Sequence, residues 1–375
     1  MWTASDYQYM SRALQLARRG LYSTDPNPRV GCVIVKDDVV LSEGWHQKAG
    51  QPHAEIEALK NTIENNASEN ISGATCYVTL EPCAHHGRTS PCTESLIKAG
   101  IRKVVAATID PNPLVAGKGL QQLTEAGIET ASGLMEAQAV ELNPGFIMRM
   151  QQGRPFVRCK LAMSLDGKTA LLNGESKWIS SSESRIDAQK LRARSSAIMT
   201  GIGTVIADDP SMNVRLPETS AWAKDGQQPL RIILDSRLET PLDAKILSLP
   251  GDVIIFHASN DKENKQNLEN TGAELVFVNA KRGPDFLEYV LAYLATEKEI
   301  NEILLETGSN LAGEMMQAGL IDELIIYLAP TLLGQDAKSL FQLPLLDNMS
   351  DRISLHFSDI RAIGKDIRIK ATLNR

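Results

Sequence analysis

Apolar positions in the first 150 residues follow two patterns, short continuous runs and longer stretches with helical spacing. Residues 6–19 have helical spacing and end at Gly20, which predicts an N-terminal helix with a glycine C-cap. The short runs are typical of buried strands and lie at 30–35, 39–45, 74–80 and 103–108. Further helical patterns lie at 55–65, 93–99 and 119–126. This order, with a short edge segment after Gly127, predicts a three-layer α/β domain.

The second half of the chain repeats the alternation after a polar break. A helical pattern over 135–150 stops at Gln151-Gln152-Gly153-Arg154-Pro155, so we predict two domains, residues 1–150 and 151–375. Predicted strands then lie at 156–163, 197–201, 231–235, 253–257, 274–278, 303–306, 323–328 and 367–372. Helical patterns include 182–193 and 311–318, with turns at 164–168 and 201–204. We predict a mostly parallel, layered α/β fold of the nucleotide-binding type.

Composition narrows the classes of function. The formal net charge is −7, whereas a protein that grips long stretches of phosphate backbone uses clustered Lys and Arg. We therefore expect a small free substrate and no nucleic-acid partner. No run of about 18 apolar residues occurs, which predicts no membrane span. Five cysteines in a chain of this size, and a start without a basic and apolar leader, favour the cytoplasm.

The strongest chemical signal is His53-Ala54-Glu55, followed by Cys83 and Cys92, each of which is preceded by proline. One imidazole and two thiolates are three zinc ligands, and they leave the fourth tetrahedral position for water. Zinc lowers the pKa of that water to about 7, and a nearby carboxylate can carry its proton to a leaving amine. Nucleobase deaminases use this arrangement. We predict His53, Cys83 and Cys92 as zinc ligands and Glu55 as the acid/base.

The cysteine spacing departs from the general deaminase pattern. There two residues separate the cysteines, whereas here eight residues lie between Cys83 and Cys92. We expect an excursion through His85-His86-Gly87-Arg88 and a helix that restarts at Pro91. The alternative is a pair of reduced core cysteines. The upstream His-x-Glu and the two prolines favour the zinc site.

Two glycine turns in the second half favour a dinucleotide lying across the strand ends. Glu306-Thr307-Gly308-Ser309 follows a strand and opens a helix, where free backbone N–H groups bind phosphate well. Gly201-Ile202-Gly203-Thr204 is the other turn; taken singly, each is typical of a plain loop. Arg192 and Arg215 are candidates to clamp a substrate phosphate, although surface arginines are usually only solvated.

The chain resembles the bifunctional deaminase-reductase family of bacterial riboflavin biosynthesis. The matching blocks keep the family's order and span nearly the whole sequence. In the first half they are Asn27-Pro28 before Val30-Gly31, His53-Ala54-Glu55, and the stretch from Thr79 to Cys92. In the second half they are Ser164 to Gly167, Gly174 to Ile179, Ala207 to Pro210, and Glu306 to Gly313. The eight-residue cysteine spacing is this family's own.

The resemblance implies a cytidine-deaminase-like N-terminal domain and a dihydrofolate-reductase-like C-terminal domain. The first would use Zn²⁺ to deaminate a diamino-pyrimidinone that carries a phosphoribosylamino group; the second would use NADPH to reduce the ribosyl chain to ribityl. We also expect a homo-oligomer. Positions implied for NADPH contact are Ala162, Trp178, Thr204, Asp208, Ser236, Gly308, Ser309, Asn310, Leu311, Ala312, Gly313 and Glu314. Positions implied for substrate contact are Asn27, Lys160, Ser176, Arg192, Met212, Arg215 and Glu306. Asp208 is the candidate proton donor or organiser for the reduction, and Lys160 is a second candidate whose alternative is a salt-bridged lysine.

Two rival hypotheses share the zinc ligands. A nucleic-acid-editing deaminase with an unrelated C-terminal domain would have a basic surface and stacking aromatic residues, whereas this chain is acidic and 5% aromatic. A non-catalytic, zinc-stabilised scaffold has no need of an acid/base residue, so the presence of Glu55 argues against the scaffold hypothesis.

Overall fold

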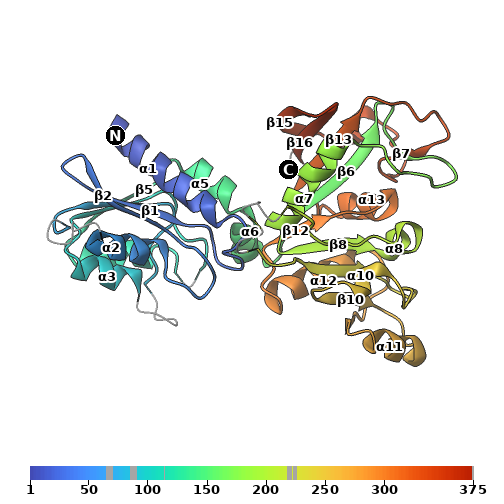
Figure 1. Ribbon diagram of the computed structural model, residues 1–375, viewed down its shortest axis with the longest axis horizontal. Coiled ribbons are helices and arrows are strands. Elements are labelled where there is room, and N and C mark those ends of the chain that lie inside the picture. Colours follow the sequence, from blue (N-terminus) through green and yellow to red (C-terminus); the bar gives the residue numbers. More distant parts are fainter. Residues whose placement is uncertain (65–70, 85–90, 114, 218–221, 223–225, 374–375) are drawn as a thin grey trace. The chain divides into compact units, whose positions relative to one another are not determined.

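The computed structural model describes residues 1–64, 71–84, 91–113, 115–217, 222 and 226–373. Its contacts divide the chain into two compact units, Met1–Gly153 and Arg154–Arg375. Figure 1 shows that each unit is a sheet with helices packed against it. The predicted excursion through His85, His86, Gly87 and Arg88 lies outside the described residues.

A five-stranded sheet in the order β2-β1-β3-β4-β5 lies at the centre of the first unit. Its strands are β1 (Gly31–Lys36), β2 (Val39–Trp45), β3 (Thr75–Val78), β4 (Lys103–Ala106) and β5 (Glu129–Ser132). β1 pairs antiparallel with β2 and β3, whereas β3, β4 and β5 run parallel. The carboxyl ends of β3 and β4 therefore meet at one edge, where the Glu81 N–H donates to the Thr108 carbonyl at 2.9 Å.

Helices cover both faces of this sheet. Ile34, Val78 and Leu96 belong to the core on one face, which packs against α2 (Ala54–Glu64), α3 (Cys92–Lys98) and α4 (Lys118–Glu125). Met10, Val33 and Leu134 belong to the core on the other face, against α1 (Ala4–Ala17) and α5 (Glu136–Leu142). A short 3-10 turn, η1 (Arg18–Gly20), extends α1. The predicted three-layer α/β arrangement is confirmed.

The prediction of one helix over 135–150 is wrong. The chain forms α5 and then α6 (Pro144–Gln152), with a break at Asn143. Pro144 starts the second helix, and the Asn143 side chain pairs with the backbone of Arg29: its Oδ1 accepts from the Arg29 N–H at 2.8 Å and its Nδ2 donates to the Arg29 carbonyl at 2.9 Å. This tertiary contact holds residue 143 outside helical geometry.

A nine-stranded sheet in the order β11-β10-β9-β8-β12-β6-β13-β16-β15 organises the second unit. The neighbours from β11 to β13 are parallel, and β16 and β15 add an antiparallel edge. The parallel strands are β6 (Phe156–Ser164), β8 (Ala197–Gly201), β9 (Leu230–Leu234), β10 (Val253–His257), β11 (Glu274–Phe277), β12 (Glu302–Leu305) and β13 (Glu323–Ala329). The edge strands are β15 (Leu355–Ile363) and β16 (Asp366–Leu373). A separate pair joins β7 (Lys168–Ala170) and β14 (Lys338–Ser339), and η3 (Met349–Asp351) precedes β15.

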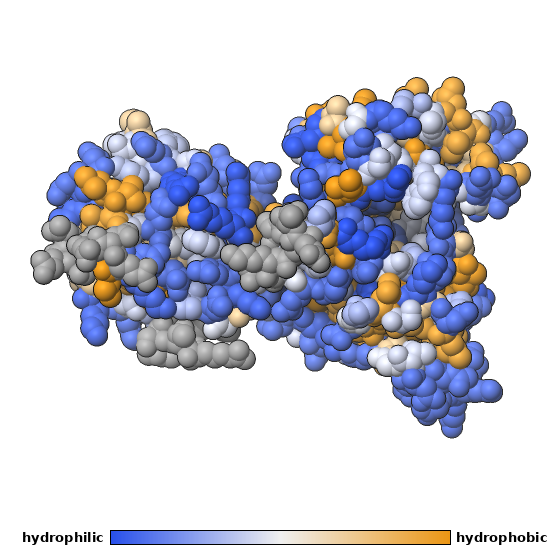
Figure 2. Space-filling model, viewed as in Figure 1, coloured by the Kyte–Doolittle hydropathy of each residue, from blue (hydrophilic) through white to orange (hydrophobic). Residues whose placement is uncertain are grey.

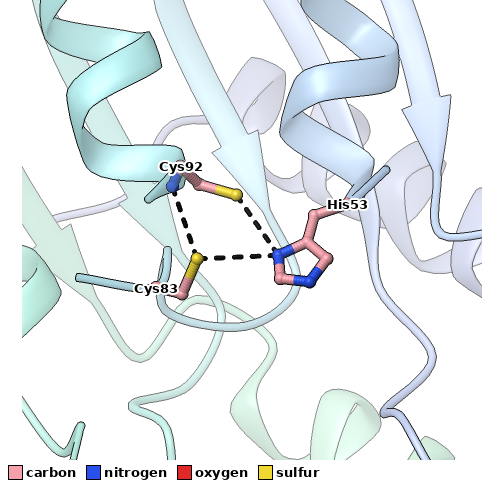
Figure 3. A group of neighbouring side chains, drawn as sticks. All are labelled: His53, Cys83 and Cys92. Atoms are coloured by element: carbon pink, nitrogen blue, oxygen red, sulfur yellow. Dashed lines mark hydrogen bonds between the residues drawn. The ribbon is translucent and has the colours of Figure 1, made fainter. Parts of the chain in front are cut away.

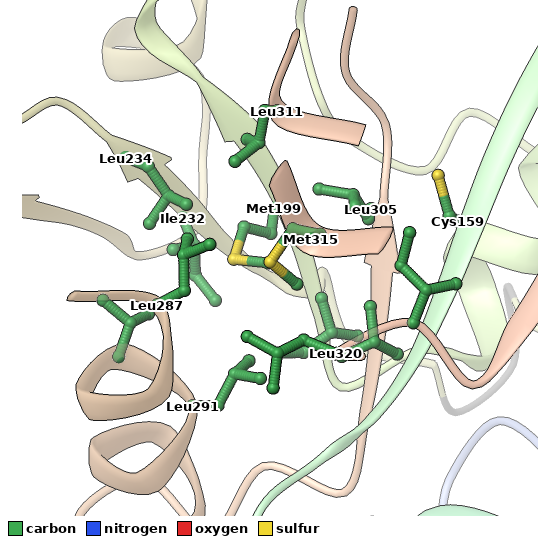
Figure 4. Close-up of a cluster of buried hydrophobic side chains, with 14 of the residues drawn as sticks. Cys159, Met199, Ile232, Leu234, Leu287, Leu291, Leu305, Leu311, Met315 and Leu320 are labelled. Carbon is green, nitrogen blue, oxygen red and sulfur yellow. The ribbon is translucent and has the colours of Figure 1, made fainter. Parts of the chain in front are cut away.

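Successive residues of these strands point to opposite faces and so build two cores. On one face, Met199 and Leu305 pack with Met315 and Leu291, as Figure 4 shows. Helices α12 (Pro284–Thr296) and α13 (Ser309–Gln317) cover that face of the sheet. On the other face, Ile198 packs in a separate cluster with residues of the helices that cover it. These helices are α8 (Ile202–Asp208), α10 (Lys245–Ser248) and α11 (Lys262–Glu269), whereas α7 (Ser182–Arg194) packs with Leu304 and Tyr327 in a third cluster.

Two details of the second unit differ from the sequence prediction. The predicted turn at 201–204 is instead the start of α8, which begins at Ile202 directly after β8. Strand β15 was not predicted, because seven of its nine residues are exposed, none is buried, and its apolar residues show no clear period. Among the described residues, none of the helices is long and apolar enough to cross a membrane.

Candidate active sites

The three predicted zinc ligands come together in the first unit (Figure 3). His53 lies directly before α2, Cys83 lies beyond the end of β3, and Cys92 is the first residue of α3. His53 Nδ1 is 3.6 Å from Cys83 Sγ and 3.3 Å from Cys92 Sγ, and the three ligand atoms all lie within 4.8 Å of one another. The eight residues between the cysteines therefore do not prevent the two sulfurs from sharing one metal.

These residues fit a zinc ion. With Zn–S near 2.3 Å and Zn–N near 2.1 Å, tetrahedral geometry requires a sulfur–nitrogen separation of about 3.6 Å. The observed separations of 3.6 and 3.3 Å are close to that value. The Cys92 N–H also donates to Cys83 Sγ at 3.3 Å. Hydrogen bonding from Cys92 and from His53 lowers the pKa of Cys83 and favours its thiolate, whereas the same hydrogen bond raises the pKa of Cys92.

Glu55 lies in the first turn of α2, two residues after His53, and its residue is only 3% exposed. Burial raises the pKa of its carboxyl to about 7. A carboxyl that titrates near neutral pH can both take up and release a proton, which is the property that an acid/base catalyst needs.

Asn27 is held beside this site by His46, a contact that the sequence did not reveal. His46 Nδ1 is 3.0 Å from the Pro52 carbonyl, and a carbonyl only accepts, so Nδ1 carries the proton. Burial lowers the pKa of His46 and favours the neutral ring. Nε2 then accepts a hydrogen bond from the Asn27 amide nitrogen Nδ2 at 3.1 Å, which leaves the Asn27 carbonyl oxygen for another partner. The His46 and His53 rings meet edge to face, with centroids 5.5 Å apart.

A cavity of about 1360 Å³ lies in the second unit, near the carboxyl ends of the parallel strands. Most of the predicted cofactor and substrate positions line it. They are Lys160, Ala162, Ser176, Trp178, Arg192, Thr204, Asp208, Met212, Arg215, Ser236, Glu306, Gly308, Ser309, Asn310, Leu311 and Glu314. Ala312 and Gly313 do not line it; both are buried in α13, and Gly313 packs against the Gln342 carbonyl.

A charged cluster occupies one part of this cavity. Arg192 donates to both carboxylate oxygens of Glu306, Nε to Oε1 at 2.6 Å and a terminal nitrogen to Oε2 at 2.9 Å. The Lys160 ammonium is 3.8 Å from Glu306 Oε2. Burial alone would raise the pKa of Glu306, but the charges of Arg192 and Lys160 outweigh it and lower the pKa to about 2. Arg192 is thus a buried, paired arginine and not a solvated one.

The turn after β12 leads directly into helix α13, as the sequence predicted. Gly308 is the N-cap of α13 and makes no side-chain cap hydrogen bond, so the N–H groups of the first turn remain available.

Trp178 is 70% exposed, and the Arg185 guanidinium lies 4.5 Å from its ring centroid. Both residues line the cavity.

Two family descriptions match the chain, the cytidine and deoxycytidylate deaminase zinc-binding region over residues 3–108 and the RibD C-terminal domain over residues 155–369. Riboflavin biosynthesis protein RibD of Escherichia coli (strain K12) is 46% identical over 368 residues, which cover 96% of this chain and 98% of that protein. The chain belongs to the RibD family. The RibD protein of Haemophilus influenzae is also 46% identical, over 99% of this chain and 98% of that protein.

Solved RibD structures agree with this membership. Acinetobacter baumannii RibD, form 1, superimposes with a TM-score of 0.90 at 46% identity, over 99% of both chains. A Thermotoga maritima protein described as a diaminohydroxyphosphoribosylaminopyrimidine deaminase/5-amino-6-(5-phosphoribosylamino)uracil reductase superimposes with a TM-score of 0.86 at 32% identity, also over 99% of both chains.

As a member of the RibD family, the chain is a bifunctional deaminase and reductase of riboflavin biosynthesis that acts on a small molecule. Its deaminase part uses zinc, and its dihydrofolate-reductase-like part uses NADPH. The predicted fold class, paired activities and cofactors are confirmed. Both rival hypotheses, the nucleic-acid editor and the zinc scaffold, are thereby excluded.

Proposed function

We propose that the first unit hydrolyses the 2-amino group of 2,5-diamino-6-(5-phosphoribosylamino)pyrimidin-4-one. Water replaces the amine, ammonia leaves, and the ring becomes a uracil. The second unit then reduces the ribosyl chain with NADPH to give 5-amino-6-(5-phosphoribitylamino)uracil. We assign deamination to residues 1–150 and reduction to residues 151–375. The observation that carries the proposal is the His53, Cys83 and Cys92 triad with buried Glu55, in a unit whose contacts are separate from those of the reductase cavity.

In the deaminase site, His53, Cys83 and Cys92 would hold zinc, which when bound activates a water molecule as the nucleophile. Glu55 would take the proton from the water and give it to the departing amine. Its pKa near 7 suits both transfers. Asn27 would accept a hydrogen bond from the substrate through its carbonyl oxygen, because its amide nitrogen is turned toward His46 Nε2.

In the reductase site, NADPH would lie across the carboxyl ends of the parallel strands, with its pyrophosphate at the N-terminus of α13. Gly308 to Leu311 and Glu314 line the cavity there, and Ser236 and Thr204 follow β9 and β8. Ala162, Trp178 and Asp208 complete the proposed contacts. Because Ala312 and Gly313 face the core, they would support the helix and not touch the cofactor through a side chain.

The substrate would lie beside the charged cluster. Lys160, Arg192 and Arg215 carry three positive charges against the single carboxylate of Glu306, so the cluster has an excess of positive charge that suits a phosphate ester. Glu306 pairs with Arg192 and neutralises its charge, so the charge of Arg215 is available to bind the substrate phosphate. Ser176 and Met212 would provide the remaining contacts.

The reduction also needs a proton for the oxygen released when the ribosyl ring opens. We propose Asp208, at the end of α8, as its donor or organiser. Lys160 is the second candidate because it lines the same cavity, although its ammonium lies 3.8 Å from Glu306 Oε2, which matches the salt-bridged alternative. Asp208 contacts Lys177 through its backbone carbonyl at 3.5 Å.

We propose that the chain forms a homo-oligomer through the β15–β16 edge of the second unit. Phe357 and Ile360 on β15 are 57% and 58% exposed, and Ile367 on β16 is 42% exposed. Figure 2 shows apolar side chains on the surface of this unit. An exposed apolar edge strand is a template for pairing with a second copy.

The five free cysteines support a reducing, cytoplasmic location.

The test is to incubate the purified protein with the diamino-pyrimidinone ribotide and identify the products by mass spectrometry. Without NADPH, the deaminated ribosylaminouracil should accumulate; with NADPH, the ribitylaminouracil should form. Reduction without prior deamination, or no change in the pyrimidine ring, would contradict the proposal.

A further inference from the structure

Glu81, two residues before Cys83, places its carboxylate against the first turn of α4. The carboxylate accepts four backbone N–H donors: Oε1 accepts from Gly119 at 2.8 Å and Leu120 at 3.1 Å, and Oε2 accepts from Gly117 at 2.9 Å and Asp110 at 3.1 Å. The residue is only 3% exposed. A carboxylate has about four acceptor positions, so this one is fully used within the protein.

Glu81 therefore caps α4 from outside the helix. The first N–H groups of an α-helix lack partners within it, and they favour a negative charge. Here that charge belongs to the segment that delivers Cys83. The fit is close, because a Cβ at Gly119 would lie 2.0 Å from the Pro82 carbonyl oxygen.

The same helix also contacts the segment of the second cysteine. Gln122 of α4 accepts a hydrogen bond from the Thr93 hydroxyl at 2.7 Å, and Thr93 directly follows Cys92. The Thr93 N–H donates to the Cys83 carbonyl at 3.3 Å. Helix α4 thus contacts the segments of both cysteines, through Glu81 in one case and Thr93 in the other.

We propose that Glu81 is a positioning residue for the zinc site, which fixes the Cys83 thiolate relative to Cys92 by anchoring residues 81–83 to α4. This inference rests on the proposed zinc ligands. It predicts a role in metal retention and not in proton transfer, because every acceptor position of the Glu81 carboxylate is already filled. Groups that orient metal ligands typically change metal affinity by about 10–100-fold when they are mutated.

Glu81→Gln tests the proposal in the full-length chain. The amide keeps the size of the side chain but turns one acceptor into a donor, which in either orientation faces two of the four N–H groups. We expect zinc to transfer to a chromogenic chelator about 10–100-fold faster than from the wild type. With cobalt in place of zinc, the absorption bands of the metal should shift. Glu129→Gln, on the exposed part of the same unit, should match the wild type.

Leu123→Ala distinguishes a positioning role from a general effect on stability. It truncates a fully buried side chain of α4 and leaves the Glu81 contacts in place. The proposal is overturned if Glu81→Gln releases zinc no faster than Leu123→Ala does. If Glu81→Gln does not fold, Glu81→Asp keeps the charge but shortens the side chain by one methylene. Zinc release from Glu81→Asp at the wild-type rate then overturns the proposal. Cys83→Ser tests the zinc ligands themselves. If this variant retained zinc, the ligand assignment would be wrong, which is a different outcome from a wrong role for Glu81.

Discussion

Arg192 and Glu306 form a pair of hydrogen bonds, 2.6 and 2.9 Å long, inside the reductase cavity. Their side chains come from α7 and from the residue after β12, which lie 114 positions apart in the sequence. Each side chain is 11% exposed. The pair holds a guanidinium at the proposed substrate site and fixes its orientation, so its loss should affect both stability and reduction.

Glu306→Gln should lower the free energy of unfolding of the second unit by about 3 kcal/mol, because breaking a buried ion pair by removing one partner costs about 3–5 kcal/mol. Reduction should fall, and deamination should not change. Denaturant unfolding and separate assays of the two activities measure this. The exposed Glu288→Gln on α12 is the matched control; equal losses in both variants would contradict the assigned role.

The same pair predicts a pH dependence of stability. The pKa of Glu306 is about 2 in the folded protein, below the ordinary value near 4.3 of an unfolded glutamate. A lowered pKa stabilises the folded state above the unfolded value, and this contribution is lost as pH falls from about 4 toward about 2. The difference in unfolding free energy between wild type and Glu306→Gln should therefore be constant from pH 5 to pH 8 and shrink below pH 4. A difference that grows on acidification would contradict this.

Glu55→Gln should retain zinc and lose most of the deaminase activity. The amide fills a similar space but cannot carry the proton, and acid–base groups contribute typically about 10²–10⁴-fold. Metal analysis and the rate of ammonia release check this. Glu57→Gln, in the same turn of α2, is the control. Near-normal turnover by zinc-loaded Glu55→Gln would assign the proton transfer to another residue.

How much of this could be predicted from the sequence depends on how local each feature is. The grouping of His53, Cys83 and Cys92 could be predicted, because residue type and short motifs indicate candidate metal ligands regardless of what lies between them. His46 and Glu81 were missed because their roles come from contacts with Pro52 and with α4, which no local pattern encodes. The break at Asn143 was missed for the same reason, since its side chain pairs with Arg29.

The proton donor for the reduction is tested by Asp208→Asn and Lys160→Met in a single-turnover assay with the already deaminated ribotide. If Asp208 acts as donor or organiser, Asp208→Asn should slow this step while deamination stays at the wild-type rate. Should Asp208→Asn react normally and Lys160→Met fail, the proton role belongs to Lys160.

The zinc content and the two activities of Cys83→Ser test the central claim most directly, with Cys159→Ala as a control that removes a buried thiol of the second unit. Elemental analysis of the wild type and of Cys159→Ala should give one zinc ion per chain. Cys83→Ser should contain almost none, should not deaminate, and should still reduce the deaminated ribotide with NADPH. Zinc retained by Cys83→Ser, or reduction lost together with deamination, would contradict two separate sites with zinc serving only the first.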